Sequence, residues 1–410
     1  MKHQMWSRFF IAIALVLSLT SCTEAAKSTH PTAQTTSQPT SAVSDVTSIN
    51  DILQPELRTY NLPAMAAVVI SDGKIVAQGA VGVRKFGDTT PVTINDQWLL
   101  SSCTKAMTAT VVAILIERGK LTWTTTMAEI YPELKDRMLP KYRGVTIIEL
   151  LSHHAGLPGN TTPPGTDLAY WLGLTGPITQ QRYEFTKDFL CQPESPEVDA
   201  FPEPGTKYLY SNAGYVIAGA VAEQVTGKSW EDLITTLLFQ PLGMTTAGFG
   251  AMGTDDQVEQ PRLHSFVDNQ VTPISVEDSR HLAGLSPVLW PCGGVHVSLE
   301  DWAKFVTMHL EGEKSGSQLL KPATFKILHT PPFDASGQGY ALGWFVQGNP
   351  WTDGTVLIHD GSILVNCAGV LISQESNLAV LVTTNIGPPY GDIACDEVVR
   401  ALFYKYLKTK

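Results

Sequence analysis

Three short motifs in the chain contain residue types that together could activate a serine. The first is Ser102-Cys103-Thr104-Lys105, in which a hydroxyl and an amine stand three positions apart. On a helix, residues i and i+3 share a face, so the two side chains can meet. A serine is a weak nucleophile until a base removes its proton, and a lysine can be that base once burial lowers its pKa. The spacing therefore fits nucleophilic catalysis through an acyl-enzyme.

Spacing alone is a weak signal, because Ser71-Asp72-Gly73-Lys74 has the same pattern. That second match joins two apolar runs, 65–70 and 75–83, and Ser-Asp-Gly between such runs predicts a hairpin turn. A serine at the start of a helix is also usually just a cap. The first match, however, opens the stretch 102–119, whose small and aliphatic residues end at a glycine and predict a largely buried helix. That helix is the setting that the chemistry requires.

The other two motifs follow later in the chain. Tyr210-Ser211-Asn212 is its only Tyr-x-Asn. His359-Asp360-Gly361 lies on a predicted strand and is followed by Ser362. A glycine there lets the backbone approach a ligand closely, and the next N–H can serve as an oxyanion donor. The three motifs thus offer a nucleophile, a base, a second proton carrier and a site for developing negative charge.

With these motifs in this order, the chain resembles the penicillin-recognising serine hydrolases. Within them it looks most like the branch of class C β-lactamases, low-molecular-mass DD-peptidases and related esterases and D-amino-acid peptidases. The resemblance runs from about Val46 to Lys410. It includes Leu-Leu-Ser-His-His-Ala-Gly-Leu-Pro at 150–158, Gln-Pro-Leu-Gly-Met at 240–244 and Tyr-Ala-Leu-Gly-Trp at 340–344, which match recurrent segments of the family.

The resemblance implies a role for each catalytic residue. Ser102 would be the nucleophile and Lys105 would help to deprotonate it. Tyr210 would act as a general base that later protonates the leaving group. The oxyanion hole would consist of the backbone N–H groups of Ser102 and Ser362.

The resemblance also implies the substrate-binding residues, Asn212, His359, Gly361 and Ser362. Asn212 would hold a substrate amide or carbonyl, and His359 would stand where many β-lactamases have a lysine. A histidine is mostly neutral near pH 7, so a fixed cation for a substrate carboxylate is missing from this motif. We therefore expect weak β-lactam hydrolysis and better activity on neutral esters or amides, unless an arginine such as Arg182 replaces the lost charge.

Two further groups of residues have simpler interpretations. His154-Ala155-Gly156 also has the pattern His-x-Gly, but it precedes Tyr210 and matches a structural loop of the family. We interpret His153 and His154 as residues that form hydrogen bonds in this loop. Tyr170 and Trp171 lie in a long segment rich in Pro and Gly, 159–204, and could either line the active site or simply pack.

The order of predicted elements indicates an α+β fold of the β-lactamase/transpeptidase type, an α/β sandwich. Strands are expected near both chain ends, and the C-terminal ones are 356–358, 368–372 and 378–384. Helices predominate between the two groups of strands, and a final helix covers about 392–407. We expect one antiparallel sheet built from both ends and flanked by helices. A mainly helical subdomain, about 106–285, would be inserted in this catalytic domain, 46–410.

The N-terminus is typical of an exported protein. Lys2 and Arg8 flank the start of an apolar run, 9–19, that is too short to span a bilayer. It ends in Leu-Thr-Ser-Cys, which looks like a bacterial lipobox. We expect a signal peptide over 1–21, lipidation at Cys22 and a flexible Thr/Ser/Pro-rich linker over 22–45. The protein would be a membrane-anchored lipoprotein on the periplasmic or extracellular face, although ordinary secretion with an unmodified Cys22 is the alternative.

Composition excludes several other functions. Lysine and arginine number 28 against 39 aspartates and glutamates, and no basic run occurs, so nucleic acid is not an expected partner. No CxxC, HExxH or HxHxD spacing occurs, so we predict neither a metal nor a cofactor. The spacing leaves open how the remaining cysteines pair, namely Cys103, Cys191, Cys292, Cys367 and Cys395.

The sequence thus favours a serine hydrolase that acts on a small amide or ester, as a β-lactamase-related esterase or peptidase. A true β-lactamase or a D-Ala-D-Ala carboxypeptidase is the alternative within the same chemistry. A non-catalytic ligand-binding or sensor lipoprotein on the same fold is the alternative of another class. An unrelated α/β-hydrolase is disfavoured, because no Gly-x-Ser-x-Gly occurs in the chain.

Overall fold

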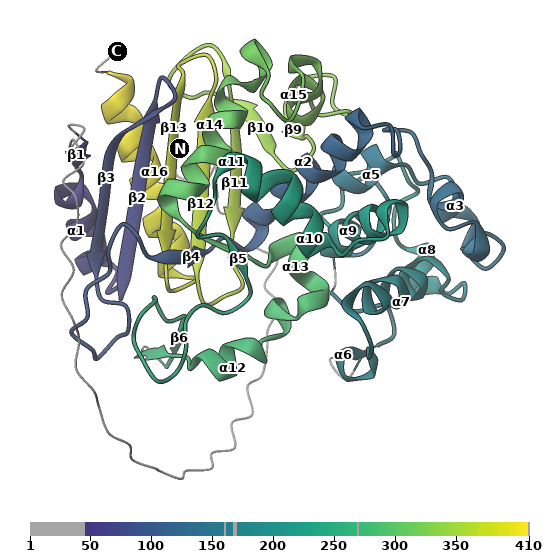
Figure 1. Ribbon diagram of the computed structural model, residues 1–410, viewed down its shortest axis with the longest axis horizontal. Helices are drawn as coiled ribbons and strands as arrows, with labels where there is room; N and C mark the ends of the chain where they lie inside the picture. The colour runs from purple at the N-terminus through teal and green to yellow at the C-terminus, as the bar shows by residue number, and fades with distance from the viewer. Residues whose placement is uncertain (1–45, 160, 167–169, 269, 409–410) are drawn as a thin grey trace, which may run out of the picture. The chain divides into compact units, whose positions relative to one another are not determined.

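An eight-stranded sheet drawn from both ends of the chain organises the computed structural model (Figure 1). Its first three strands in space come from the N-terminal part and the other five from the C-terminal part. The two groups meet where β2 pairs with β13, with Ala67 opposite Val382. In spatial order the strands are β1 (Thr47–Ser48), β3 (Lys74–Gly82), β2 (Ala64–Ser71), β13 (Leu378–Thr384), β12 (Cys367–Ser373), β11 (Thr355–Gly361), β10 (Phe345–Gly348) and β9 (Gly339–Tyr340).

The predicted fold is confirmed, but one pair of strands in the sheet is parallel. The seven pairs of neighbouring strands are antiparallel except for β1 and β3, which run parallel over two residues. The central strands β12 and β13 are buried along their whole length. Such continuous apolar runs are expected where helices cover both faces of a sheet.

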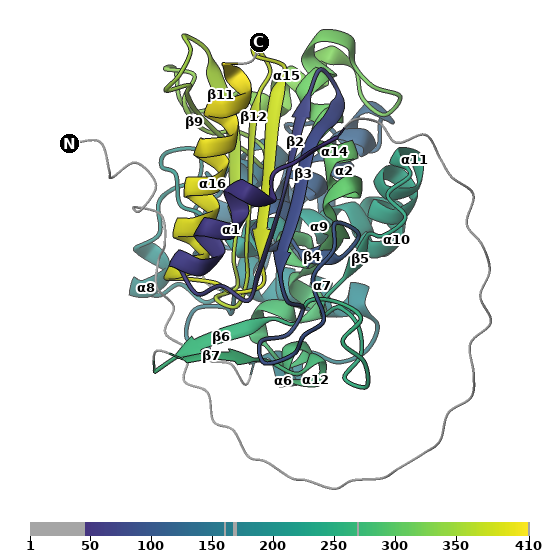
Figure 2. The ribbon, with the colours of Figure 1, turned by 90° about the vertical axis from the view of Figure 1, so that its left-hand side faces the viewer.

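Helices lie on both faces (Figure 2). One face is covered by α1 (Asn50–Thr59) and α16 (Tyr390–Leu407), and the other by α14 (Leu299–Ser315). Beyond α14, the helix α2 (Thr104–Glu117) packs against α9 (Asn212–Thr226) and α13 (Trp290–Gly293). Every residue of α2 from Thr104 to Leu115 is buried, as predicted for this stretch.

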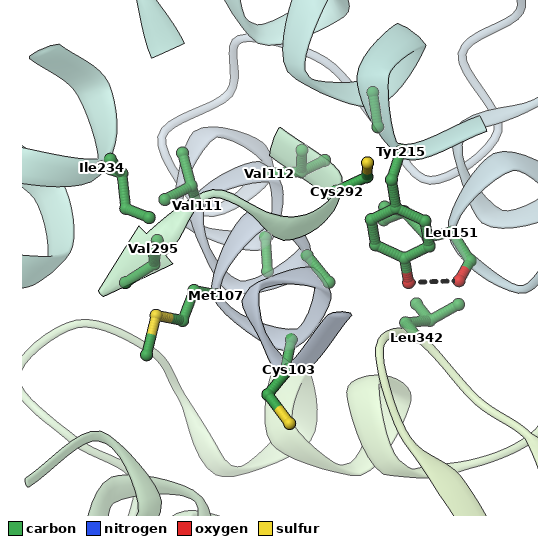
Figure 3. Packing of buried hydrophobic residues seen from close by; sticks show 14 of the residues in the cluster. Cys103, Met107, Val111, Val112, Leu151, Tyr215, Ile234, Cys292, Val295 and Leu342 are labelled. Atoms are coloured by element: carbon green, nitrogen blue, oxygen red, sulfur yellow. Dashed lines mark hydrogen bonds between the residues drawn. The ribbon is translucent and has the colours of Figure 1, made fainter. Parts of the chain in front are cut away.

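Side chains from distant segments surround α2 (Figure 3). Met107, Val111 and Val112 lie among apolar residues from α9, α13 and the 340–344 segment. Tyr215 of α9 packs there too and donates a hydrogen bond of 2.6 Å to the main-chain oxygen of Leu151. The helix that begins at the Ser102 motif is therefore the centre of the hydrophobic core, which holds its N-terminus in place.

The part of the chain between β3 and β9 is mainly helical, with short strands as well. The strands β4 (Gln97–Leu99), β8 (Val295–Ser298) and β5 (Gly248–Phe249) form a small sheet, and β6 (His264–Val267) pairs with β7 (Gln270–Pro273). The remaining helices are α3 (Met127–Ile130), α4 (Pro140–Arg143), α5 (Ile147–Leu151), α6 (Tyr170–Gly173), α7 (Ile178–Leu190), α8 (Pro196–Asp199), α10 (Trp230–Ile234), α11 (Gln240–Leu242), α12 (Val276–Arg280) and α15 (Pro322–His329).

The structure describes residues 46–159, 161–166, 170–268 and 270–408. The predicted signal peptide, the lipidation site Cys22 and the linker 22–45 lie outside these residues and stay predictions. Within the described ranges, none of the helices has the length and apolar character needed to span a membrane. The five cysteines in these ranges are all free thiols.

Candidate active site

A strained turn presents Ser102 to solvent. Ser101 has a φ of +46°, a left-handed conformation that residues other than glycine rarely adopt. Its buried hydroxyl donates to Oδ1 of Asn366 over 3.0 Å, and Nδ2 of Asn366 donates to the oxygen of Leu99 over 2.8 Å. The turn continues as a short 3₁₀ helix, η1 (Ser101–Cys103), and then as α2. Ser102 stays partly exposed between two buried neighbours, so a substrate can reach its hydroxyl.

Lys105 lies one turn further along and is fully buried, and its amine is within hydrogen-bond distance of the Ser102 hydroxyl. Its Nζ is 3.0 Å from Oγ of Ser102, 2.8 Å from Oδ1 of Asn212 and 2.8 Å from the main-chain oxygen of Cys292. Burial lowers the pKa of Lys105 to about 8. None of the three partners is a carboxylate, so no ion pair holds the amine in its charged form. A neutral amine here can donate to Asn212 and Cys292 and accept the serine proton.

Tyr210 and Asn212 reach the same point from the start of α9. Ser211 caps this helix, because its Oγ accepts from the N–H of Gly214 over 3.1 Å. The ring of Tyr210 lies beside Lys105, whose Nζ is 4.9 Å from the ring centroid. Burial raises the pKa of Tyr210, and a hydrogen bond with the Ser102 side chain opposes that rise. The motif therefore places a protonated phenol and an amide at the serine.

The third motif touches the nucleophile through its glycine. A Cβ at Gly361 would lie 2.1 Å from the main-chain oxygen of Leu100 and 2.9 Å from the main-chain nitrogen of Ser102. Strand β11 can pass this close to η1 only because the residue has no side chain. Ser362 follows directly, and its hydroxyl accepts a hydrogen bond from the N–H of Leu364 over 3.0 Å.

His359 does not act as a cation that could bind a substrate carboxylate. It is buried, and its Nδ1 lies 2.8 Å from the main-chain oxygen of Asp360, which can only accept. Nδ1 therefore carries the hydrogen, and Nε2 accepts from the hydroxyl of Tyr340 over 3.1 Å. Burial, with the charge of Lys105, lowers the pKa of His359 to about 3. The ring is neutral at any working pH and both of its nitrogens have partners within the protein.

Arg182, the possible exception to the missing charge, does not replace it. Its side chain is fully buried in α7 and paired with Glu223 of α9 and Glu231 of α10. The guanidinium also donates to the main-chain oxygens of Pro287 and Val288. The sequence could not indicate this, because both glutamates are distant along the chain. Arg182 links α7 to α9 and α10 through these ion pairs and does not face a substrate.

We expect Arg182→Met to lower the free energy of unfolding by about 3–5 kcal/mol, because it leaves two carboxylates without their buried partner. Arg182→Lys, which keeps the charge but not the five donors, is the matched control and should lose less. Denaturant-induced unfolding of the three proteins measures the difference. A loss of less than about 1 kcal/mol for Arg182→Met would mean that the ion pairs behave like exposed ones.

The aromatic residues singled out in the sequence separate into two groups. Tyr170 and Trp171 pack against Phe185 of α7, with the Trp171 and Phe185 rings stacked 5.9 Å apart, which favours the packing alternative. His153 instead lies at the site, with its ring centroid 4.3 Å from that of Tyr210.

Three other contributors to the site, the carbonyl of Cys292, Tyr340 and Asn366, were not predicted. A main-chain carbonyl carries no signal in a sequence. The tyrosine lies in one of the family-like segments, which was its only indication.

Comparison with known proteins identifies the family. Residues 49–403 match the family model described as Beta-lactamase. The chain belongs to the β-lactamase family. Penicillin-binding protein 4 of Amycolatopsis lactamdurans is 27% identical over 361 residues, which cover 81% of this chain and 83% of that protein. Protein flp of Staphylococcus aureus is 21% identical over 354 residues, which cover 83% of this chain but only 63% of that protein.

A solved structure agrees with this assignment at the level of the fold. The hydrolase EstCE1, described as having promiscuous acyltransferase activity, superimposes with a TM-score of 0.68 at 20% identity. The superposition covers 85% of this chain and 97% of EstCE1. Members of the β-lactamase family are serine hydrolases as a rule. This chain therefore belongs to the serine hydrolase superfamily that contains the β-lactamases and penicillin-binding proteins.

Proposed function

We propose that this protein is a serine hydrolase that forms an acyl-enzyme on Ser102 and acts on a small ester or amide. One observation carries the proposal. The buried amine of Lys105 lies 3.0 Å from Oγ of Ser102, with a pKa lowered to about 8 and no carboxylate among its three hydrogen-bond partners. Such an amine is a base of the strength that deprotonation of a serine needs near neutral pH.

In the proposed mechanism, the amine of Lys105 takes the proton of Ser102 while Oγ attacks the carbonyl carbon. The N–H groups of Ser102 and Ser362 would hold the oxyanion that forms. Because burial keeps Tyr210 in its phenol form, its hydroxyl is suited to protonate the leaving group, and it regains a proton from Lys105. In deacylation the relay runs in the opposite direction: water attacks the acyl carbon as its proton passes through Tyr210 to Lys105, and Lys105 returns a proton to Oγ of Ser102 as the acid leaves.

We further propose that the substrate is a neutral ester, or an amide without a free carboxylate. The cationic position of the third motif holds a neutral His359 whose Nε2 accepts from Tyr340. The one arginine considered as a substitute, Arg182, is engaged by two glutamates. A penicillin-recognising activity is the alternative, which the name of the relative from Amycolatopsis lactamdurans favours.

A pair of peptides tests the substrate class directly. A D-Ala-D-Ala peptide with a free carboxylate and the same peptide as its C-terminal amide differ in one charge only. A charged contact with the substrate carboxylate is worth about 1.5–3 kcal/mol, which corresponds to roughly 10- to 150-fold in kcat/KM. We expect no preference of that size for the free acid, and we expect a short p-nitrophenyl ester to be turned over faster than nitrocefin. A preference of tenfold or more for the acid, or for nitrocefin, would favour the alternative.

A further inference from the structure

His153 adopts a backbone conformation that needs an explanation. It ends α5 with a φ of +62°, in the left-handed region, and in this helix cap the N–H of His154 donates to the oxygen of Glu149 over 2.9 Å. Its side chain is almost completely buried, with 1% exposed. A buried, bulky residue persists in such a conformation only when its surroundings hold it there.

The contacts of His153 lie on both sides of Tyr210. Its main-chain oxygen accepts from the N–H of Leu209 over 2.8 Å, and its Nδ1 accepts from the N–H of Ser211 over 3.0 Å. Its ring also packs on the Tyr210 ring at 4.3 Å, and on the ring of Tyr340 at 4.4 Å. His153 therefore accepts hydrogen bonds from the N–H groups of both residues adjacent to Tyr210, and its ring packs on the Tyr210 ring.

The protonation state of His153 fits this contact. Since Nδ1 accepts a hydrogen bond, the ring hydrogen is on Nε2. Burial, together with the charge of Lys105, lowers the pKa of His153 well below its usual value. The lone pair on Nδ1 is thus available to Ser211 throughout the working pH range.

We propose that His153 is a positioning residue that aims the hydroxyl of Tyr210 at the leaving group. The inference rests on the role of Tyr210 in the proposed function. Its neighbour His154 has no such part, because the ring of His154 bonds to the main-chain oxygen of Ser152 and stacks on Phe333. The two adjacent histidines thus differ in what they touch, which provides a matched control.

Positioning of a proton donor has a chemical signature that loss of packing lacks. An alkoxide leaves poorly unless it is protonated as the bond breaks, whereas p-nitrophenolate leaves readily without a proton. If Tyr210 is misplaced, the loss in rate will therefore be larger for an alkyl ester than for a p-nitrophenyl ester of the same acid. A merely structural change lowers the amount of active enzyme and affects both esters equally.

The test compares His153→Gly with His153→Asn, because both residues tolerate a positive φ. Only asparagine keeps an acceptor at the distance of Nδ1 from Cβ. For His153→Gly we expect kcat on the alkyl ester to fall about 10²-fold and kcat on the p-nitrophenyl ester less than about tenfold. His153→Asn should recover part of the difference, Tyr210→Phe should reproduce the pattern, and His154→Asn should behave as the wild type.

Thermal unfolding of each variant shows whether it folds. If His153→Gly is unfolded, His153→Leu, which preserves volume but has no acceptor, takes its place in the comparison. Equal losses for the two esters, or no recovery with asparagine, would overturn the positioning role. A wild-type protein without turnover of either ester and without labelling of Ser102 by a fluorophosphonate would instead refute the proposed function, so the two failures are distinguishable.

Discussion

Ser102→Ala should abolish both ester hydrolysis and covalent labelling by an activated-serine probe. We expect kcat/KM to fall by at least about 10³-fold, because the variant removes the nucleophile of a cooperative set. Folding should be unaffected, since the residue is small and its side chain is partly exposed. Turnover, labelling and thermal unfolding of the purified variant measure the three effects.

Ser71→Ala is the matched control for this variant. Ser71 opens the other Ser-x-x-Lys match of the chain, but it ends strand β2 and its hydroxyl donates to Asp72 in the hairpin turn. We expect this variant to keep full activity and labelling. Peptide mass spectrometry that finds the probe on any serine other than Ser102 would contradict the assignment. Turnover by the wild type would exclude the sensor alternative.

Lys105→Met should lower kcat/KM by about 10³-fold or more, because methionine preserves most of the volume and removes the base. In the wild-type enzyme the neutral amine is the active form. Its pKa of about 8 predicts that kcat/KM rises with pH up to about 8 and then levels off. Below that pH the fraction of neutral amine, and with it kcat/KM, falls about tenfold per pH unit. Rates on a neutral ester from about pH 6 to pH 10 give this profile.

Lys105→Arg tests whether charge or basicity matters, since an arginine stays protonated throughout this range. It should be as inactive as the methionine variant. Lys74→Met, in the hairpin of the second Ser-x-x-Lys match, should retain the activity and the pH profile of the wild type. A wild-type kcat/KM that does not change between about pH 6 and pH 9, or a Lys105→Met variant within tenfold of the wild type, would exclude Lys105 as the base.

Two imidazoles close to Lys105 do not titrate in the working pH range. The two buried imidazoles near Lys105 are both kept neutral, with burial as the main cause and the charge of Lys105 as the next. Asp360, the acidic residue of the third motif, faces away from Lys105. It lies on the other face of β11, where burial and the charges of Asp396 and Asp392 of α16 raise its pKa to about 7, so it titrates within the assayed pH range as well. Strand alternation therefore points its side chain away from Lys105, as the sequence allowed, but its charge still contributes to the raised pKa of Tyr210.

Local patterns were enough to predict the elements that contain the motifs. The hairpin of β2 and β3 follows from two apolar runs around Ser-Asp-Gly, and the buried helix α2 follows from its apolar composition. The strands β11, β12 and β13 lie where the β-rich runs predicted them, and α16 begins two residues before its expected start. Strands of two to four residues, such as β9 and β10, were not predicted, because so short a run has no measurable period.

The sequence by itself determined that Ser102 and Lys105 meet, because a spacing of three positions in a helical segment places the two side chains side by side. With the family resemblance it also indicated which tyrosine, asparagine and glycine would join them. Only the tertiary structure decided the rest. It buried Lys105 against the carbonyl of Cys292, paired His359 with Tyr340, and enclosed Arg182 between two glutamates. These contacts join residues up to 187 positions apart, and a pKa or an ion pair depends on the groups that surround a side chain in space rather than on its neighbours along the chain.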